Sequence, residues 1–235
     1  MILLDIKNLD AFYGSSQVLF NLNIGIKKNK ITALLGRNGA GKSSTFKAIT
    51  GMIRIKSGSI ILDTIDLTNK ATNFRAKNGI GYVPEDRQVF PEHTVEENID
   101  LGKKTNRKGK NIWEKEKIWE TFPVLSKLKK RLAGQLSGGE QQMLSIARTL
   151  VGNPSILLLD EPSEGLAPII VEDISQILLN LKKIGATILL AEQNMHFCMN
   201  IAEEAIIIDR GKNVWKGNIN QLKKNKEIMN KYLAV

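Results

Sequence analysis

The segment Gly36–Ser43, GRNGAGKS, combines residue types that can bind a triphosphate. It matches the pattern G-x-x-x-x-G-K-[ST], follows the apolar run Ile31–Leu35 and opens a helical pattern over Ser44–Thr50. Its glycines permit backbone angles that point several N–H groups at phosphate oxygens, and the helix adds the positive end of its dipole. Lys42 would supply a cation for the β- and γ-phosphates, and Ser43 a hydroxyl for Mg²⁺. A glycine-rich turn with a surface lysine is the alternative. The predicted nucleotide contacts are Gly36, Arg37, Asn38, Gly39, Ala40, Gly41, Lys42, Ser43 and Ser44.

Two acidic residues follow a second apolar run, Ile156–Leu159. In open α/β sheets, ligands bind at the carboxyl ends of the strands, which is where Asp160 and Glu161 would lie. Asp160 is predicted to hold Mg²⁺ through a water molecule, and Glu161 to act as the general base for an attacking water. Taken alone, the pair would more simply be two solvated acids at a strand end. Beside a phosphate-binding loop, it predicts hydrolysis of a nucleoside triphosphate.

A third motif, LSGGEQQ at Leu136–Gln142, precedes a helical pattern. Taken alone, it would be a glycine-rich helix cap. With the other two motifs in this order, the chain resembles the ABC ATPase family over essentially its whole length. The resemblance implies an α/β P-loop NTPase core of the ABC ATPase type, with an antiparallel β subdomain and an inserted α-helical subdomain. It also implies that ATP held by one subunit is contacted by the facing subunit through Ser137, Gly138, Gly139 and Glu140.

Three more positions are assigned by the resemblance. Tyr13 matches the aromatic residue that stacks on adenine, with a buried core tyrosine as the alternative. Glu85 stands where most members have a glutamine that senses Mg²⁺ and couples to the membrane subunit. Ala167 stands in the partner-facing loop, Ser163–Pro168, where most members have an aspartate.

Gln193 stands where most members have a switch histidine. An amide can donate a hydrogen bond to the γ-phosphate, but it cannot become cationic or transfer a proton. We therefore expect Glu161 to do the base chemistry and Gln193 to orient the phosphate. His196 could substitute for the histidine, although an ordinary helix-start residue is the favoured interpretation. His93 is expected to be exposed in a loop.

The combination of Glu85, Gln193 and Ala167 resembles the second ATPase subunit of branched-chain amino-acid importers, whose close relatives serve urea and other amides. The resemblance implies ATP and Mg²⁺ as cofactors and a head-to-tail dimer with a second, non-identical ATPase subunit. It also implies two membrane permease subunits, an extracytoplasmic solute-binding protein acting indirectly, and a cytoplasmic place at the inner face of the cell membrane. The loop Glu85–Pro91 would transmit closure to the permease, with Val89 and Phe90 as candidate contacts or, equally, as core residues.

Two other classes of protein fit the sequence less well. A soluble ABC ATPase acting on nucleic acid or ribosomes would suit the net charge of +10. However, lysines are scattered along the chain, and aromatic residues total only 6% and are not interleaved with the basic runs. Members of that class commonly carry two tandem ATPase domains, whereas each motif occurs once in this chain. A regulatory domain that binds nucleotide without hydrolysing it conflicts with Lys42, Asp160 and Glu161. ATP hydrolysis coupled to transport is therefore the favoured interpretation.

The elements that must position these residues follow from periodicity. Alternating patterns predict half-buried strands, and continuous apolar runs predict strands covered on both faces. The predicted strands are Ile2–Lys7, Asn21–Lys27, Ile31–Leu35, Ser59–Asp63, Gly79–Val83, Ile156–Asp160, Thr187–Glu192, Ala205–Asp209, and two short ones near Arg210–Val214 and Trp215–Gly217. The predicted helices beyond Ser44–Thr50 are Thr94–Gly102, Asn111–Leu128, Gly139–Val151 and Ile219–Tyr232. The chain is thus expected to be one ABC ATPase domain, 1–235, with residues 1–84 and 154–235 as the α/β core and 85–153 as the helical subdomain.

Length and composition agree with one large domain of 235 residues. No apolar run approaches the ~18 residues of a membrane-spanning helix, and the first ten residues do not resemble a signal peptide. Cys198, the single cysteine, excludes an internal disulfide and is expected to be buried rather than reactive. The basic stretch 102–110 is expected to be an exposed loop of the helical insertion.

Overall fold

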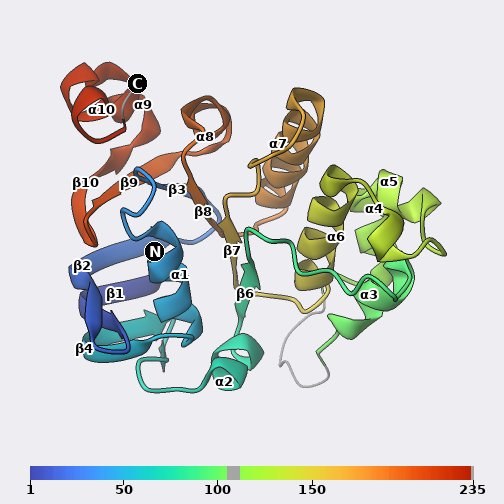
Figure 1. Cartoon of the computed structure of the whole chain (residues 1–235), viewed down its shortest axis with the longest axis horizontal. Coiled ribbons are helices and arrows are strands. Elements are labelled where there is room, and N and C mark those ends of the chain that lie inside the picture. The colour runs from blue at the N-terminus through green and yellow to red at the C-terminus, as the bar shows by residue number, and fades with distance from the viewer. Residues whose placement is uncertain (105–111, 234–235) are drawn as a thin grey trace.

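The computed structural model describes residues 1–104 and 112–233, which form two β-sheets with helices packed around them (Figure 1). The antiparallel sheet has the order β2-β1-β4-β5, with β1 at Ile2–Tyr13, β2 at Ser16–Lys27, β4 at Arg54–Leu62 and β5 at Ile65–Asp66. Strands β1 and β2 are longer than predicted because they continue to a tight hairpin at Gly14. Register shifts in this hairpin interrupt the alternation of apolar residues, so the sequence revealed only part of each strand.

The six-stranded sheet has the order β10-β9-β3-β8-β7-β6 and carries the predicted phosphate-binding loop after β3. It is parallel except for β10, which pairs antiparallel with β9. Its strands are β3 (Ile31–Leu35), β6 (Ile80–Val83), β7 (Ile156–Asp160), β8 (Ile188–Glu192), β9 (Glu204–Asp209) and β10 (Lys212–Asn218). Every residue of β3, β7 and β8 is buried, as the continuous apolar runs predicted.

Two hydrophobic cores lie on opposite faces of this sheet. Leu34, Leu158 and Leu189 belong to a core shared with the antiparallel sheet and with α1 (Lys42–Thr50). Their chain neighbours Leu35, Leu159 and Leu190 belong to a second core shared with α6 (Gly138–Leu150) and α7 (Pro168–Lys183). Successive strand residues point to opposite faces, so one sheet is held rigidly from both sides.

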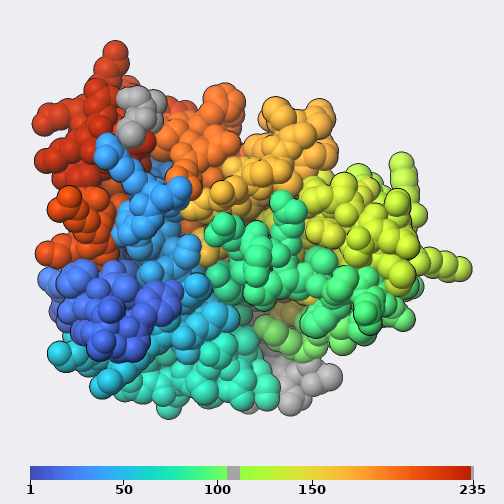
Figure 2. Space-filling view, viewed as in Figure 1, coloured from blue at the N-terminus to red at the C-terminus, as the bar shows by residue number. Residues whose placement is uncertain are grey.

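The helices α3 (Val95–Leu101), α4 (Lys115–Thr121), α5 (Pro123–Lys127) and α6 gather at one end of the molecule, away from β1, β2 and β4 (Figure 1). The space-filling view shows the same separation, with the N-terminal strands (blue) at one end and these helices (green to yellow-green) at the other (Figure 2). The remaining helices are α2 (Thr72–Lys77), α8 (Met195–Ile201), α9 (Ile219–Lys224) and α10 (Lys226–Leu233), with a 3₁₀ turn at Ala133–Gln135.

Three predictions about these elements were wrong in detail. Asn111, the first residue of the helix expected over Asn111–Leu128, lies outside the described residues. The rest of that range holds two helices, because Pro123 cannot donate a backbone hydrogen bond and starts α5. The helix expected over Ile219–Tyr232 is divided at Asn225, whose ψ of 78° is not helical. The two short strands near residues 210–217 are the single strand β10, with a register shift between Asn213 and Trp215. Helices α2 and α7 were not predicted. Of the basic stretch 102–110, residues 105–110 lie outside the described residues.

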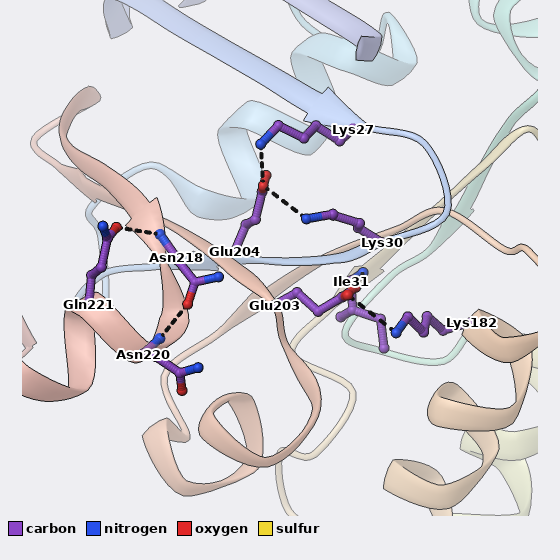
Figure 3. Close-up of polar contacts among 9 residues, drawn as sticks. All are labelled: Lys27, Lys30, Ile31, Lys182, Glu203, Glu204, Asn218, Asn220 and Gln221. Atoms are coloured by element: carbon purple, nitrogen blue, oxygen red, sulfur yellow. Dashed lines mark hydrogen bonds and ion pairs between the residues drawn. The ribbon is translucent and has the colours of Figure 1, made fainter. Parts of the chain in front are cut away.

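Charged side chains join the segments at the amino ends of β3 and β9 (Figure 3). Glu204 forms ion pairs with Lys27 and with Lys30, the second at 3.4 Å. Glu203 pairs with Lys182 at the end of α7, at 3.2 Å, and accepts a hydrogen bond from the backbone N–H of Ile31. Beside them, a capping box between Asn218 and Gln221 starts α9. These contacts fasten β2, β9 and α7 at the edge of the sheet opposite the phosphate-binding loop.

Candidate functional site

The loop between β3 and α1 requires its glycines for two different reasons. Gly41, at the start of α1, has φ of +111°, a left-handed conformation that side chains strongly disfavour. Gly36 needs its missing side chain for another reason, since a Cβ there would lie 2.5 Å from the carbonyl oxygen of Ile208 on β9. All three loop glycines were expected to adopt unusual backbone angles, but only Gly39 and Gly41 have positive φ.

Lys42 is buried within this loop, with 4% of its surface exposed. Its Nζ donates to the carbonyl oxygen of Gly36 at 2.9 Å and to that of Arg37 at 3.3 Å. It also forms an ion pair with Glu161 Oε1 at 3.1 Å. A buried cation is thus held at the loop and neutralises the carboxylate that follows β7.

Ser43 and Asp160 meet at the bottom of the site. Ser43 Oγ donates to Asp160 Oδ1 at 3.1 Å, and the hydroxyl of Tyr82 donates to Oδ2 at 3.2 Å. Burial raises the pKa of Asp160 to about 6, and the charges of Glu161 and Glu85 act in the same direction, while the two hydroxyl hydrogen bonds oppose them. A nearby cation would stabilise the ionised form of this carboxylate and so lower its pKa.

The donors present fit Mg²⁺, which prefers hard oxygen ligands such as a hydroxyl and a carboxylate. In the described part of the chain, no group of three or more His, Cys, Asp or Glu residues could hold a metal ion by itself. Mg²⁺ in nucleotide sites takes one or two protein oxygens and completes its ligands from phosphates and water. Ser43 and Asp160 are sufficient for that arrangement.

Glu161 follows β7 with a left-handed φ of +46°, a strained conformation of the kind found at functional sites. Its Oε2 accepts a hydrogen bond from Gln193 Nε2 at 2.8 Å, and its carboxylate is hydrogen-bonded to Glu164. Burial alone would raise the pKa of Glu161. Hydrogen bonds from Glu164 and Gln193, together with the charge of Lys42, outweigh burial and lower it. The pKa of Glu161 is therefore held low, which favours the ionised carboxylate.

Lys42, Ser43 and Glu161 line one cleft of about 400 Å³. Its lining residues are Asn38, Gly39, Gly41, Lys42, Ser43, Ser44, Glu85, Glu161 and Glu164. Asp160 and Gln193 are not lining residues, but they are hydrogen-bonded to Ser43 and Glu161 respectively. The structure thus brings together most of the loop residues, the acidic residue Glu161 and the acidic substitute Glu85. Gly36, Arg37 and Ala40 are not among the lining residues; Arg37 is exposed and Ala40 is buried.

The signature segment starts α6 with a capping box. Ser137 Oγ accepts from the backbone N–H of Glu140 at 3.3 Å, and the Glu140 carboxylate accepts from the N–H of Ser137 at 2.7 Å. Gly139 is packed so closely that a Cβ would lie 2.5 Å from Ile170 on α7. A Cβ on Gly138 would meet the guanidinium of Arg87. None of these signature residues is among those lining the cleft.

Several singled-out residues lie apart from the cleft. Tyr13 is 42% exposed, with Lys47 Nζ 5.8 Å from its ring centroid, so the alternative of a buried core tyrosine is wrong. His196 is exposed on α8, and its ring contacts Asn200 rather than the cleft. His93 is exposed, as expected. Cys198 is buried, as expected, and burial raises the pKa of its thiol.

Sequence reasoning missed three residues that shape the site. The hydroxyl of Tyr82 donates to Asp160, but a tyrosine inside a predicted strand does not by itself indicate a place in the site. Glu192 ends β8, and its buried carboxylate accepts from the N–H groups of Ser163, Gln193 and Asn194. Glu164 contacts Glu161. The acidic ends of two consecutive buried strands, at Asp160 and Glu192, were a usable signal because parallel strands end at the same edge.

Comparison with known proteins identifies relatives across the whole chain. A protein-family model described as "ABC transporter" matches residues 19–164. The branched-chain amino acid transport ATP-binding protein BraG of Pseudomonas aeruginosa is 37% identical over 99% of this chain and 100% of its own length. The probable branched-chain amino acid transport protein LivF of Archaeoglobus fulgidus is 38% identical over 91% of each chain. The lipopolysaccharide export protein LptB of Haemophilus influenzae is 33% identical over 100% of this chain and 98% of its own.

Solved structures agree. A nucleotide-free ATP-binding cassette from an ABC transporter superposes with a TM-score of 0.85 at 28% identity, covering 97% of this chain and 98% of that one. An ATP-binding cassette in its ADP conformation gives a TM-score of 0.84 at 28% identity, covering 97% of each chain. None of the helices in the described part of this chain is long and apolar enough to cross a membrane.

Proposed function

Because this chain belongs to the ABC transporter ATP-binding family, with the family's P-loop ATPase fold, we propose that it energises the import of branched-chain amino acids. It binds ATP, and its hydrolysis of ATP is coupled to transport. The import of branched-chain amino acids is supported by the two relatives named for that transport, at 37% and 38% identity. Lipopolysaccharide export has weaker support from LptB, at 33% identity. A urea or amide importer remains the alternative from the sequence, and the relatives named above are transport proteins rather than nucleic-acid ATPases.

The meeting of Lys42, Gln193 and Glu161 is the observation that carries the proposed mechanism. Lys42, with the N–H groups of the loop, would hold the β- and γ-phosphates and withdraw charge from the bond that breaks. Glu161 would accept a proton from the attacking water, since it is held ionised at the edge of the same cleft. Gln193 would fix the orientation of Glu161 and of the γ-phosphate without taking up a proton.

Ser43 and Asp160 are the residues proposed to hold Mg²⁺, with Glu85 at the same cleft. When bound there, Mg²⁺ would supply positive charge that stabilises the negative charge of the phosphates during hydrolysis. Tyr82 fixes the second oxygen of Asp160, which leaves the first directed at Ser43. The adenine would stack on the exposed ring of Tyr13.

The residues Ser137–Glu140 are proposed to contact ATP held by a second, non-identical ATPase subunit arranged head-to-tail. Support comes from their position at the exposed start of a thirteen-residue helix, whose dipole favours an anion. The loop Ser163–Pro168 would face the same subunit. We further propose that residues 85–153 form a helical subdomain inserted in the core of 1–84 and 154–235.

A second cleft of about 400 Å³ is proposed to receive a helix of the membrane permease. It lies between residues of α1, α2 and β6 on one side and of α3 and α6 on the other, and Met52, Phe90 and Leu101 expose apolar surface there. Arg148 holds Phe90, since its guanidinium lies 4.9 Å from the ring centroid and its Nη2 donates to the carbonyl of Gln88 at 2.6 Å. Val89 packs against the core instead. Permeases, an extracytoplasmic binding protein and a place at the inner membrane face are part of this proposal.

The proposed base is tested with Glu161→Gln in the complex purified with its own membrane subunits. The amide retains the shape but cannot accept the proton, so turnover is expected to fall by about 10²–10⁴-fold while Mg·ATP still binds. Glu203→Gln is the matched control, because it changes a carboxylate at the opposite edge of the sheet. Full turnover in Glu161→Gln would show that the base has been assigned to the wrong residue.

The solute is tested by reconstituting the same complex with its binding protein in vesicles. Leucine, isoleucine or valine is expected to stimulate ATP hydrolysis and to accumulate, whereas urea is not. Stimulation by urea alone would replace the branched-chain proposal with the urea importer. Co-purification with an export complex in place of a binding protein would favour the lipopolysaccharide alternative.

A further inference from the structure

Glu164 lies where the nucleotide cleft meets the loop Ser163–Pro168. Its side chain lines the cleft with Lys42 and Glu161. The chain turns sharply here, because the N–H of Glu164 donates to the carbonyl of Glu161 at 3.1 Å and both Glu161 and Gly165 have positive φ. This turn brings the two carboxyl groups into hydrogen-bond contact.

A hydrogen bond between two carboxyl groups requires a proton on one of them. Glu161 is the ionised partner, because Lys42 pairs with its Oε1 and Gln193 donates to its Oε2. Glu164 therefore carries the proton. The contact with Glu161, with burial and like charge, raises the pKa of Glu164 to about 7.

The acceptor capacity of Glu161 is nearly used up by these contacts. An ionised carboxylate has roughly four acceptor positions on its two oxygens. Lys42, Gln193 and Glu164 occupy three of them. A base needs a free, correctly directed lone pair to take a proton from water, so a donor that stays on Glu161 competes with the attacking water.

The charges that face Glu164 come from four segments. The carboxylates are Glu161 after β7, Glu85 after β6 and Glu192 at the end of β8. The cations are Lys42, which reaches Glu161, and Arg87, whose Nη2 lies 4.0 Å from where a Cβ on Gly165 would be. Loss of the proton would place a fourth negative charge in this group, so an ionised Glu164 would be repelled from Glu161.

We propose that Glu164 is a positioning residue that occupies Glu161 as a proton donor, and that displacing its loop or removing its proton frees Glu161 for the attacking water. The inference rests on the proposed role of Glu161 as base. Glu164 and most of its loop are exposed, so the facing ATPase subunit can reach and move them. Closure of the two subunits would then both complete the site and release the base.

Two substitutions separate this role from a purely structural one. Glu164→Gln keeps a donor at every pH, because an amide needs no added proton to donate. Glu164→Ala removes the donor at every pH. Glu172→Gln is the matched control, since it also neutralises an exposed glutamate nearby, on α7, whose carboxylate contacts Gln176 rather than the cleft.

The experiment measures kcat and KM for ATP of the complex, without solute, between about pH 6 and about pH 8. With a pKa of about 7, the fraction of unprotonated Glu164 rises from about a tenth to about nine tenths over this range, so kcat of the wild type should rise about tenfold more than in Glu164→Ala. Glu164→Gln should match the slow rate of the wild type at low pH throughout the range. Glu164→Ala should match its fast rate at high pH. KM should change little, and Glu172→Gln should follow the wild type.

Coincident profiles of the Gln and Ala variants, whether both fast, both slow or both like the wild type, would overturn the inference. This outcome is distinguishable from failure of the proposed base. If Glu161→Gln abolishes turnover while the Glu164 variants coincide, only the role of Glu164 falls. If Glu161→Gln keeps full turnover, the base assignment falls and the inference with it.

Discussion

The six-stranded sheet has buried or half-buried carboxylates at two edges, one where the parallel strands begin and one where they end. The two edges differ in the cations that pair with these carboxylates. At the amino ends of β3 and β9, Glu203 and Glu204 are met by Lys182, Lys27 and Lys30. Asp160, Glu161 and Glu192 lie at the carboxyl ends of β7 and β8. Among the ion pairs of the described residues, only the pair of Lys42 with Glu161 involves one of these three carboxylates.

The pKa values follow this difference. Burial would raise the pKa of Glu204, but its hydrogen bond with Lys27 and the charge of Lys30 outweigh burial and lower it. Burial dominates at Asp160 and Glu192, whose pKa values are raised. One edge is thus neutralised by the chain itself and stabilises the fold, whereas the other keeps negative charge that a ligand cation would relieve.

Replacing one lysine at each edge should separate the two roles most strongly. Lys42→Ala removes the cation that would hold the phosphates, so turnover should fall by about 100-fold or more. Lys27→Ala removes a half-exposed partner of Glu204 and should leave turnover unchanged. Steady-state ATP hydrolysis of the complex measures both. Equal effects of the two substitutions would remove the contrast between the edges.

Asp160→Asn should stabilise the chain while abolishing Mg²⁺-dependent turnover. The pKa of Asp160 is raised from 3.8 to about 6, so the folded chain binds more protons than the unfolded chain in this interval, and stability falls as pH rises through it. The Asn variant lacks this penalty and should gain about 2–3 kcal/mol above about pH 6.5. Below about pH 4 the gain should vanish. Denaturant unfolding at the two pH values measures it, and a less stable variant at neutral pH would contradict the burial argument.

Glu204→Gln should have the opposite sign. The folded pKa of Glu204 is lowered, so its contribution is present above the unfolded value of 4.5 and is lost as pH falls through the folded value. The substitution should cost about 1 kcal/mol at neutral pH, and less in high salt because Lys27 and Lys30 are partly exposed. Thermal unfolding in low and high salt checks this. A salt-independent loss would indicate packing rather than charge.

Lys182→Ala should give the smallest effect. Its ion pair with Glu203 has about a third of each side chain exposed, so the loss should stay within about 0.5 kcal/mol. Glu203 keeps its hydrogen bond from the backbone N–H of Ile31. A larger loss in denaturant unfolding would mean that the pair fastens α7 more strongly than an exposed pair does.

The sequence was most informative where one residue type has few physical uses. The glycines, Lys42 and Ser43 predicted the strand-loop-helix of the site, and three uninterrupted apolar runs predicted β3, β7 and β8. Order and spacing of the motifs predicted the family. The ends of helices were predicted less reliably, because Pro123 and Asn225 each divide a helix although the apolar pattern continues across them.

Contacts that depend on an unusual backbone angle or on the pairing of distant segments were not predictable from one sequence. The pairing of Glu164 with Glu161 depends on a left-handed residue, and glutamate gives no sign of that conformation. The hydrogen bond from Tyr82 to Asp160 depends on the register of β6 against β7. Even the reason for Gly36, its approach to the carbonyl of Ile208, required the position of β9.

The hydroxyl of Ser137 has two capacities, and the cap at the start of α6 uses only one. It accepts from the N–H of Glu140, and an accepting hydroxyl can still donate its own hydrogen. A phosphate arriving at this helix could therefore be bound without unwinding the first turn. Association and release of two such subunits would then require little refolding, and the start of α6 could bind and release a phosphate through many cycles with its cap intact.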